Sequence, residues 1–426
     1  MTPKSDVPSN PECTKRSPSS MFAVAAVLVY VAVLPFTHNA ALKNLAIVMM
    51  GISTGWSAYR REWRLDVRSP ITLAIIGVVC ASLVSSVVSP TLVENLYAMR
   101  NHFVPTLLLL ILVPSYFRTE FRARMLMAVV VSAFAVRLGL TIVELVQLAD
   151  MSRGRAEGEY IKGFMLEATM YLPIAAGLLF FVAGYWRVFI AGILLVGLAA
   201  LLYMEGRTPL VASLVGILAV PFVLRRFRYV AGTAAIAVAV SSGIFVLQPN
   251  LAARFGSIFQ SSTYTGAEGM SLRYPIWVGT LEIVTDHPLL GYGFGWKKLG
   301  RVATEGGYVA RWREATDQLS HLKVEYFSLP TDKVNPHNLW IQIAFEGGSI
   351  GVLMYALMLA VLLSQAVVCT RRLPPALQPI SAACIGMLGA HIVVNAANGL
   401  WMGTGPTLAM IALLEMCRQT NAIVRP

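Results

Sequence analysis

Apolar runs of about 18 residues or more recur along nearly the whole chain, and each is long enough to cross a hydrocarbon core of roughly 30 Å as a helix. The runs show no strict alternation of apolar and polar residues. Lipid offers backbone amides no hydrogen-bond partners, so this pattern predicts α-helices and not a β-barrel. We expect about twelve spans, near residues 21–36, 41–59, 70–88, 96–116, 123–148, 163–183, 187–204, 209–224, 229–247, 338–369, 375–394 and 400–417.

Arginine clusters occupy alternate connections between these runs. They are Arg60, Arg61, Arg64 and Arg68; Arg118, Arg122 and Arg124; Arg187; Arg225, Arg226 and Arg228; and Arg371 and Arg372. Cytoplasmic loops carry an excess of Lys and Arg, so these connections and both termini are predicted to be cytoplasmic. The remaining connections then face the periplasm of a bacterial inner membrane.

One outer connection, residues 248–336, is long enough to fold, and it carries many aromatic residues and a helix-like stretch from Ser271 to Thr285. The chain therefore divides into five predicted parts. They are a disordered cytoplasmic tail (1–20), nine transmembrane helices (21–247), a large periplasmic loop domain (248–336), a periplasmic-surface helix with three more transmembrane helices (337–418), and a cytoplasmic tail (419–426).

The composition agrees with a membrane protein. Hydrophobic residues make up 56% of the chain and charged residues 13%, with a mean hydropathy of +0.65, outside the balance of soluble chains. The net charge of +12 lies mostly in short loops and forms no basic face, so nucleic acid is excluded as a partner and membrane lipids are expected instead.

His337 lies in the sequence Asn335-Pro336-His337-Asn338, at the start of a long apolar stretch. We expect Asn335 to be the N-cap and Pro336 the first helical residue, which places His337 in the first turn. The positive end of the helix dipole favours a neutral imidazole there, and a neutral imidazole can accept a proton. The alternative is a histidine that only caps or packs. Gly347-Gly348 divides the stretch, so 337–346 is predicted to be a short helix at the membrane surface.

Two arginines on the outer side are candidates for holding an anion. Arg207 lies in a tight turn between two apolar spans, where a charge is costly unless it has a partner. Arg273 begins the helix-like stretch of the long loop. The alternatives are a cation paired with Glu205 for Arg207 and an ordinary solvated residue for Arg273.

Two further observations bear on chemistry. Arg137 and Glu144 lie seven residues apart in one span, and we interpret them as a structural ion pair rather than a site. The outer loops contain no Asp-x-Asp pair, no His-x-x-x-His and no cysteine cluster. The sequence therefore predicts no metal site and no cofactor, and arginines are left to manage the charge of a leaving group.

Several of these elements, in this order, resemble the O-antigen ligase family. They are Gly206-Arg207-Thr208-Pro209, Ser271-Leu272-Arg273, His287-Pro288-Leu289-Leu290-Gly291-Tyr292-Gly293, Pro336-His337-Asn338 and Phe345-Glu346-Gly347-Gly348-Ser349-Ile350-Gly351. The match covers about residues 165–365. The number of spans on either side of this region also agrees with the family.

The resemblance implies a GT-C-like glycosyltransferase that moves O-antigen from undecaprenyl diphosphate to a sugar of lipid A-core at the periplasmic face. It implies that His337 is the catalytic base and that Arg207 and Arg273 hold the diphosphate, with Asn338 and Glu346 as candidate supporting residues. A neutral histidine suits the base, and arginine forks suit a departing anion. The expected reaction is metal-independent and inverts the anomeric centre.

Two other interpretations remain open. An O-antigen polymerase, or another ligase of lipid-linked glycans, would share the topology, the donor and the arginines. A secondary transporter would also have about twelve spans, but it would concentrate charged residues near mid-membrane and not at one face.

Overall fold

The computed structural model describes residues 18–36, 39–62, 65–149, 161, 163–204, 206–247, 273–330, 333–399, 401 and 406–423. Within these residues every regular element is a helix, which confirms the all-α prediction. The helices are α1 (Pro18–Val33), α2 (Ala40–Tyr59), α3 (Pro70–Val88), α4 (Leu92–Tyr116), α5 (Glu120–Ala149), α6 (Phe164–Leu178), α7 (Tyr185–Tyr203), α8 (Arg207–Val223), α9 (Phe227–Leu247), α12 (Arg273–Val284), η2 (Trp296–Lys298), α13 (Leu299–Glu305), α14 (Tyr308–Glu314), α15 (Gln318–Phe327), α16 (Leu339–Arg372), α17 (Gln378–Asn395) and α18 (Pro406–Ile423).

A helix occupies each of the predicted spans, from α1 to α9 and from α16 to α18. Six described helices are long and apolar enough to cross a membrane: Pro70–Val88, Leu92–Tyr116, Glu120–Gln147, Tyr185–Tyr203, Leu339–Arg372 and Gln378–Asn395. The apolar helices Ser20–Val33, Phe164–Leu178 and Arg207–Val223 are shorter. The protein is thus a polytopic membrane protein with six such spans among its described residues, whereas the sequence predicted about twelve.

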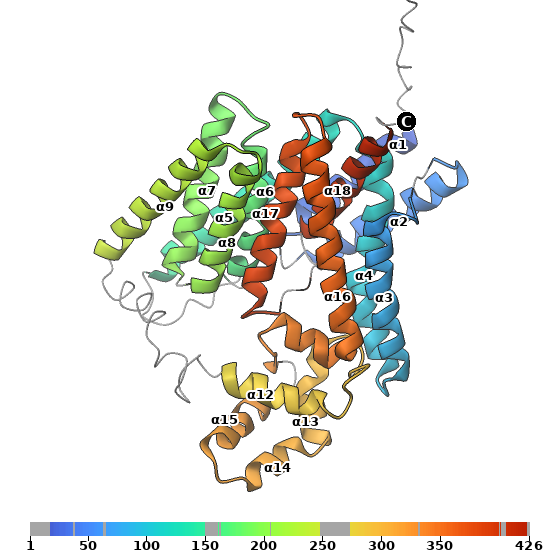
Figure 1. Cartoon of the computed structure of the whole chain (residues 1–426), viewed down its shortest axis with the longest axis vertical. Helices are drawn as coiled ribbons and strands as arrows, with labels where there is room; N and C mark the ends of the chain where they lie inside the picture. The colour runs from blue at the N-terminus through green and yellow to red at the C-terminus, as the bar shows by residue number, and fades with distance from the viewer. Residues whose placement is uncertain are drawn as a thin grey trace, which may run out of the picture.

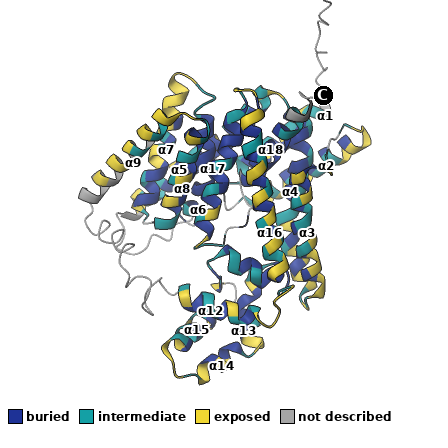
Figure 2. Cartoon of the chain, viewed as in Figure 1, coloured by how far each residue is buried: buried dark blue, intermediate teal, exposed yellow. Residues whose placement is uncertain are grey.

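The long helices form one bundle, and the small helices α12 to α15 form a lobe at one end of it (Figure 1). Helices α6, α17 and α18 are almost entirely buried and lie within the bundle, while α2, α7 and α9 expose much of their surface (Figure 2). Exposed apolar side chains such as Leu45, Val48 and Ile52 on α2 are ordinary where a helix faces lipid.

The lobe has a hydrophobic core of its own, separate from that of the bundle. It contains Ile283, Leu299, Ala303, Tyr308, Val309, Trp312, Phe327, Val334 and Phe345. Phe345 belongs to α16, and its ring stacks on Tyr292 of the lobe with 5.2 Å between centroids. The first part of α16 is therefore a component of the lobe as well as the beginning of a membrane helix.

Helix α16 is broken at Gly348, whose backbone angles are φ 60° and ψ −160°. The break lies at the glycine pair that predicted it. We refer to residues 339–347, which precede the break, as the arm. Whether the arm lies at the membrane surface stays a prediction.

The predicted tails need correction at both ends. Helix α1 already begins at Pro18 and α18 continues to Ile423, so residues 18–20 and 419–423 are helical. The remaining residues of both predicted tails, and residues 248–272 of the predicted loop domain, lie outside the described residues.

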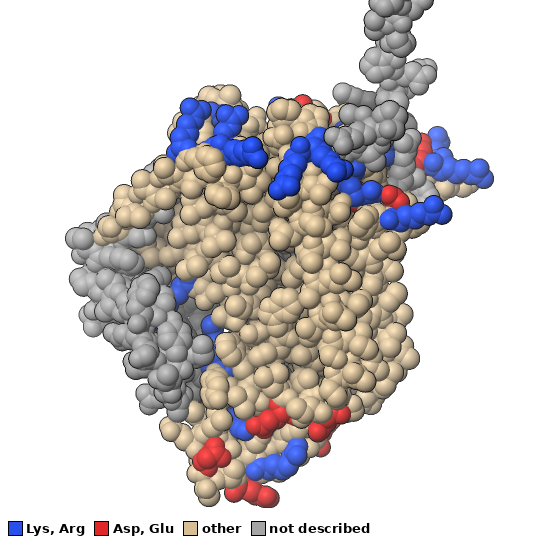
Figure 3. Space-filling view, in the orientation of Figure 1, with Lys and Arg blue, Asp and Glu red and all other residues tan. Residues whose placement is uncertain are grey.

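Charged residues divide between the two ends of the molecule. Lys and Arg gather at the end of the bundle opposite the lobe, whereas acidic and basic side chains are mixed around the lobe (Figure 3). This asymmetry is the one that the arginine-rich connections predicted.

Inside the bundle, the ion pair described for Arg137 joins it to Glu167 of α6, with 3.9 Å between Nε and Oε2. The carboxylate of Glu144 accepts a hydrogen bond from the backbone N–H of Ile161 at 3.0 Å. Tertiary packing thus supplies Glu167, from a neighbouring helix, as a partner of Arg137.

Candidate functional site

His337 lies in the turn that precedes α16. Its φ of +50° places it in the left-handed region, which residues other than glycine and asparagine seldom adopt. The side-chain oxygen of Asn335 stabilises this turn by accepting a hydrogen bond from the backbone N–H of His337 at 2.7 Å. The expectation that Asn335 caps the helix and that His337 lies in its first turn is therefore wrong.

Asn338 is the N-cap of α16. Its side-chain oxygen accepts hydrogen bonds from the backbone N–H groups of Trp340 at 2.9 Å and Ile341 at 3.3 Å. Its side-chain amide donates to the carbonyl of Ala396, just beyond α17, at 3.0 Å. Asn338 thus fixes the residue next to His337 to both the arm and the bundle.

Burial and charge both act on the imidazole of His337. Burial lowers its pKa below the usual value, and the positive charge of Arg273 lowers the pKa further. The ring also faces Tyr326, with 6.5 Å between centroids, and the Tyr326 hydroxyl donates to the Asn335 carbonyl at 2.8 Å. Burial and Arg273 thus both favour the neutral imidazole, whereas the sequence attributed the neutral form to a helix dipole.

Arg273 is the first residue of α12, which packs against α15 and the arm. Its side chain is half-buried, and burial lowers the pKa of the guanidinium. A half-buried cation attracts an anion strongly, because low exposure weakens screening by water and salt. The structure thus brings Arg273 and His337, separated widely in sequence, to one side of the lobe.

Arg207 lies on the bundle, as the first residue of α8. Helices α8 and α17 are antiparallel: Val220 contacts the Gly386 position, and Val215 contacts the Gly389 position. The close contact between Gly216 and Gly386 lies nine residues from Arg207 on one helix and nine from Asn395 on the other, or about 13 Å along each axis.

This register puts Arg207 level with the end of α17, where Ala396 receives its hydrogen bond from Asn338. Arg207 therefore lies at about the same height along the bundle axis as His337, but it belongs to the bundle. Lys and Arg side chains are visible along the hollowed side between the bundle and the lobe (Figure 3).

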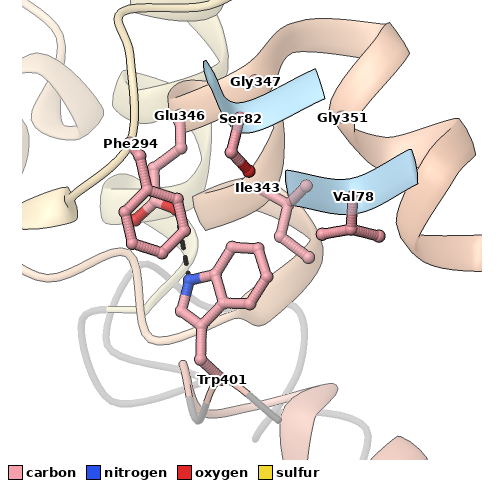
Figure 4. A pocket seen from close by; sticks show the side chains of 8 residues that line it. All are labelled: Val78, Ser82, Phe294, Ile343, Glu346, Gly347, Gly351 and Trp401. Carbon is pink, nitrogen blue, oxygen red and sulfur yellow. Dashed lines mark hydrogen bonds between the residues drawn. The ribbon is translucent and has the colours of Figure 1, made fainter. Parts of the chain in front are cut away.

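Glu346 lies at the other end of the arm and is 3% exposed. Its carboxylate accepts hydrogen bonds from Gln342 at 3.0 Å and from the Trp401 indole at 3.1 Å. Glu346 and Trp401 border a small pocket between α3 and α16 (Figure 4). Glu346 is about a dozen ångströms from His337 along the arm, so it supports the arm and does not touch the imidazole.

Sequence reasoning missed the residues that hold Glu346 and the arm in place. Lys298 is 2% exposed and donates to the side chain of Asn95 and to the carbonyl of Phe294. Asn95 was not singled out because a single polar residue at the start of an apolar span is unremarkable. Lys298 lies in the long outer loop, and nothing in the sequence marks it as buried.

Within the described residues, no three His, Cys, Asp or Glu side chains lie close enough together to share a metal ion. What the described groups offer is a neutral imidazole that can accept a proton and two arginines that can hold an anion. This combination fits the transfer of a group from a phosphate or diphosphate leaving group.

Comparison with known families agrees with this geometry. The family model described as O-antigen ligase matches residues 191–356, from α7 to a point just past the break in α16. The match covers Arg207, Arg273, His337, Asn338 and Glu346. No curated protein matches the chain. Residues 191–356 of this membrane protein therefore match the O-antigen ligase family, a family of glycosyltransferase-type enzymes.

Proposed function

We propose that the protein is an O-antigen ligase, which transfers a glycan from undecaprenyl diphosphate to a sugar hydroxyl of lipid A-core. The observation that carries the proposal is the neutral, half-buried His337 beside Arg273, within the part of the chain that matches the family. A base and a neighbouring cation are the two groups that the reaction requires.

In the proposed reaction the acceptor hydroxyl oxygen attacks the anomeric carbon of the donor. His337 accepts the hydroxyl proton as the new glycosidic bond forms. The bond between the anomeric carbon and the diphosphate oxygen breaks, and its electron pair leaves with the lipid diphosphate. Attack opposite to the leaving group inverts the anomeric centre.

Arg273 and Arg207 are proposed to hold the diphosphate, one from the lobe and one from the bundle. The guanidinium forks match phosphate oxygens in pairs, and they oppose the negative charge that grows as the bond breaks. We infer that no divalent cation is required, because arginines carry out this neutralisation.

The proposal places the lobe in the periplasm and the arginine-rich end of the bundle in the cytoplasm. Charge asymmetry between the ends of the molecule supports this orientation. Reporter fusions that locate residues 225–228 outside the inner membrane, or residues 300–330 inside it, would contradict the orientation.

The function is tested with purified protein in vesicles that contain undecaprenyl diphosphate-linked O-antigen and lipid A-core as sole acceptor. We expect glycan on lipid A-core and release of undecaprenyl diphosphate, with turnover unchanged in EDTA. Longer glycans on the lipid carrier in the absence of lipid A-core would identify a polymerase. Transbilayer movement of substrate without any transfer would identify a transporter.

A further inference from the structure

Residues 288–298 of the lobe are attached to the break in α16 through the backbone. The N–H of Tyr292 donates to the carbonyl of Phe345 at 2.8 Å, and the N–H of Ser349 donates to the carbonyl of Pro288 at 2.8 Å. A Cβ at Gly348 would overlap the backbone of Leu289. This contact is so close that the two segments move together.

The same two segments are also joined to the bundle. The Ser85 hydroxyl of α3 lies within hydrogen-bond distance of the carbonyl oxygens of Leu290 and Glu346. The Ser86 hydroxyl accepts a hydrogen bond from the backbone N–H of Phe294 at 3.1 Å. The angle of the arm is consequently set where α3, residues 288–298 and the break meet.

A lysine and a glutamate are buried at this meeting point. Lys298 is 2% exposed and Glu346 is 3% exposed, and the two side chains attract one another electrostatically. Lys298 is held by the side chain of Asn95 of α4 and by the carbonyl of Phe294. Glu346 is held by Gln342 and by Trp401, as the dashed line in Figure 4 shows for the indole.

A buried lysine and a buried glutamate are a poor source of stability, because both groups lose their hydration. Their usual advantage is that they select one arrangement of the elements that carry them. Here those elements are the lobe and the arm, and Asn338 and His337 directly precede the arm in the chain. A change of angle at the break would swing His337 away from Arg273.

We propose that Lys298 and Glu346 are positioning residues that hold His337 in place beside Arg273 through the arm. This inference rests on the proposed function and adds Lys298 to its machinery. Neither residue touches the reacting groups.

The test compares Lys298→Met and Glu346→Gln with the matched control Lys323→Met. Lys323 is also a buried lobe lysine, paired with Glu282 at 2.7 Å, but it does not hold the arm. We expect kcat to fall on the order of 10- to 100-fold in the first two variants, with the donor KM unchanged because the arginines remain. Lys323→Met should lower the melting temperature and leave kcat per folded molecule unchanged.

A second measurement separates positioning from direct electrostatics and does not depend on activity. The pKa of His337 is followed by NMR of labelled histidine in each variant. Loss of the Glu346 charge by itself would lower the pKa, whereas displacement of His337 from its buried place beside Arg273 would raise it toward the usual value. We expect a rise in both Lys298→Met and Glu346→Gln and no change in Lys323→Met.

An unchanged or lowered pKa in Glu346→Gln would overturn the positioning role, whatever the activity. If the wild-type protein transferred no glycan, the proposed function would fail, and the NMR result would still decide whether the arm positions His337. Restoration of the wild-type pKa in the double variant Lys298→Met/Glu346→Gln would also contradict the proposal, because that variant lacks the attraction.

Discussion

His337 combines a left-handed backbone with a half-buried ring next to Arg273. Because burial and the arginine lower the pKa of His337, the imidazole stays neutral to a pH below its usual value of about 6.5. Turnover should therefore hold constant near neutrality and fall only as the pH drops through that lowered pKa. The folded state should lose stability as the pH falls from about 6.5 to that lowered pKa, because the unfolded chain binds this proton first.

Arg273→Gln removes one of the two causes that lower the pKa of His337. The acid limb of the pH–rate profile should therefore move to higher pH. Arg313→Gln, at an exposed position in α14, is the control and should leave the limb in place. The profile is measured on residual turnover at saturating donor. A limb that stays in place in Arg273→Gln would show that the arginine does not act on His337.

The proposal that Arg207 and Arg273 hold the diphosphate with paired hydrogen bonds predicts that a positive charge alone is insufficient at either position. Lysine offers a single ammonium in place of a planar fork, so Arg→Lys at either position should lose most of the activity that Arg→Ala loses. Turnover and donor binding are measured on each variant, with Arg313→Lys as control. Near wild-type turnover in both lysine variants would show that paired hydrogen bonds from the two arginines are not required.

The candidates His337, Arg207 and Arg273 could be named from the sequence because they lie in the motifs that resemble the O-antigen ligase family, and their roles remain proposals. The sequence was insufficient for their surroundings. Asn335 and Asn338 are both good N-cap residues. The left-handed turn at His337 makes Asn338 the N-cap, and that turn depends on contacts with Tyr326 and α17. Lys298 resembled any loop cation, since its burial follows from tertiary packing alone.

At the scale of elements, Asn338, the N-cap of α16, contributes both to the stability of the protein and to the position of the neighbouring His337. Asn338→Ala should lower the free energy of unfolding by about 1 kcal/mol and should reduce turnover, because the hydrogen bond to Ala396 is lost as well. Asp317, which caps α15 by accepting from the Ser320 N–H, supplies the control. Asp317→Ala should cost similar stability and leave turnover unchanged. Equal turnover in both variants would mean that Asn338 is only a cap.

The break in α16 offers a sharper pair of variants. Gly348 has a positive φ and no room for a Cβ, whereas Gly347 has nothing within 4 Å of that position. Gly348→Ala should destabilise the protein by about 1–3 kcal/mol from backbone strain alone, and by more because of the overlap with Leu289. Gly347→Ala should be neutral or slightly stabilising. Thermal unfolding in detergent tests both variants. A fully stable Gly348→Ala protein would contradict the positive φ and the close contact with Leu289 at this position.

Helix positions were predictable to within a few residues because long apolar runs have few alternatives in lipid. The spans near 209–224 and 375–394 became α8 and α17, for example. The division of residues 285–336 into short helices was not predictable. Helices of seven residues such as α13 and α14 carry too few turns for a periodic pattern, and they depend on the shared lobe core.

Over the whole molecule, the lobe and the bundle meet where the candidate residues lie. His337 and Arg273 come from the lobe side, and Arg207 comes from the bundle at the level of Ala396. A substrate held by all three would therefore bridge the two parts. Such a site suits a donor whose lipid remains in the membrane while its glycan extends beyond it.

The most direct test of this account is turnover of a His337 variant that still folds. Asparagine tolerates a positive φ, so His337→Asn is chosen over alanine, with the exposed His321→Asn of α15 as control. Melting temperature, donor binding and transfer to lipid A-core are measured on the same purified preparations. We predict a stable variant that binds the lipid-linked donor and loses on the order of 10²–10⁴ in rate. A stable, donor-binding His337→Asn protein with nearly full turnover would remove His337 from the chemistry and contradict the account.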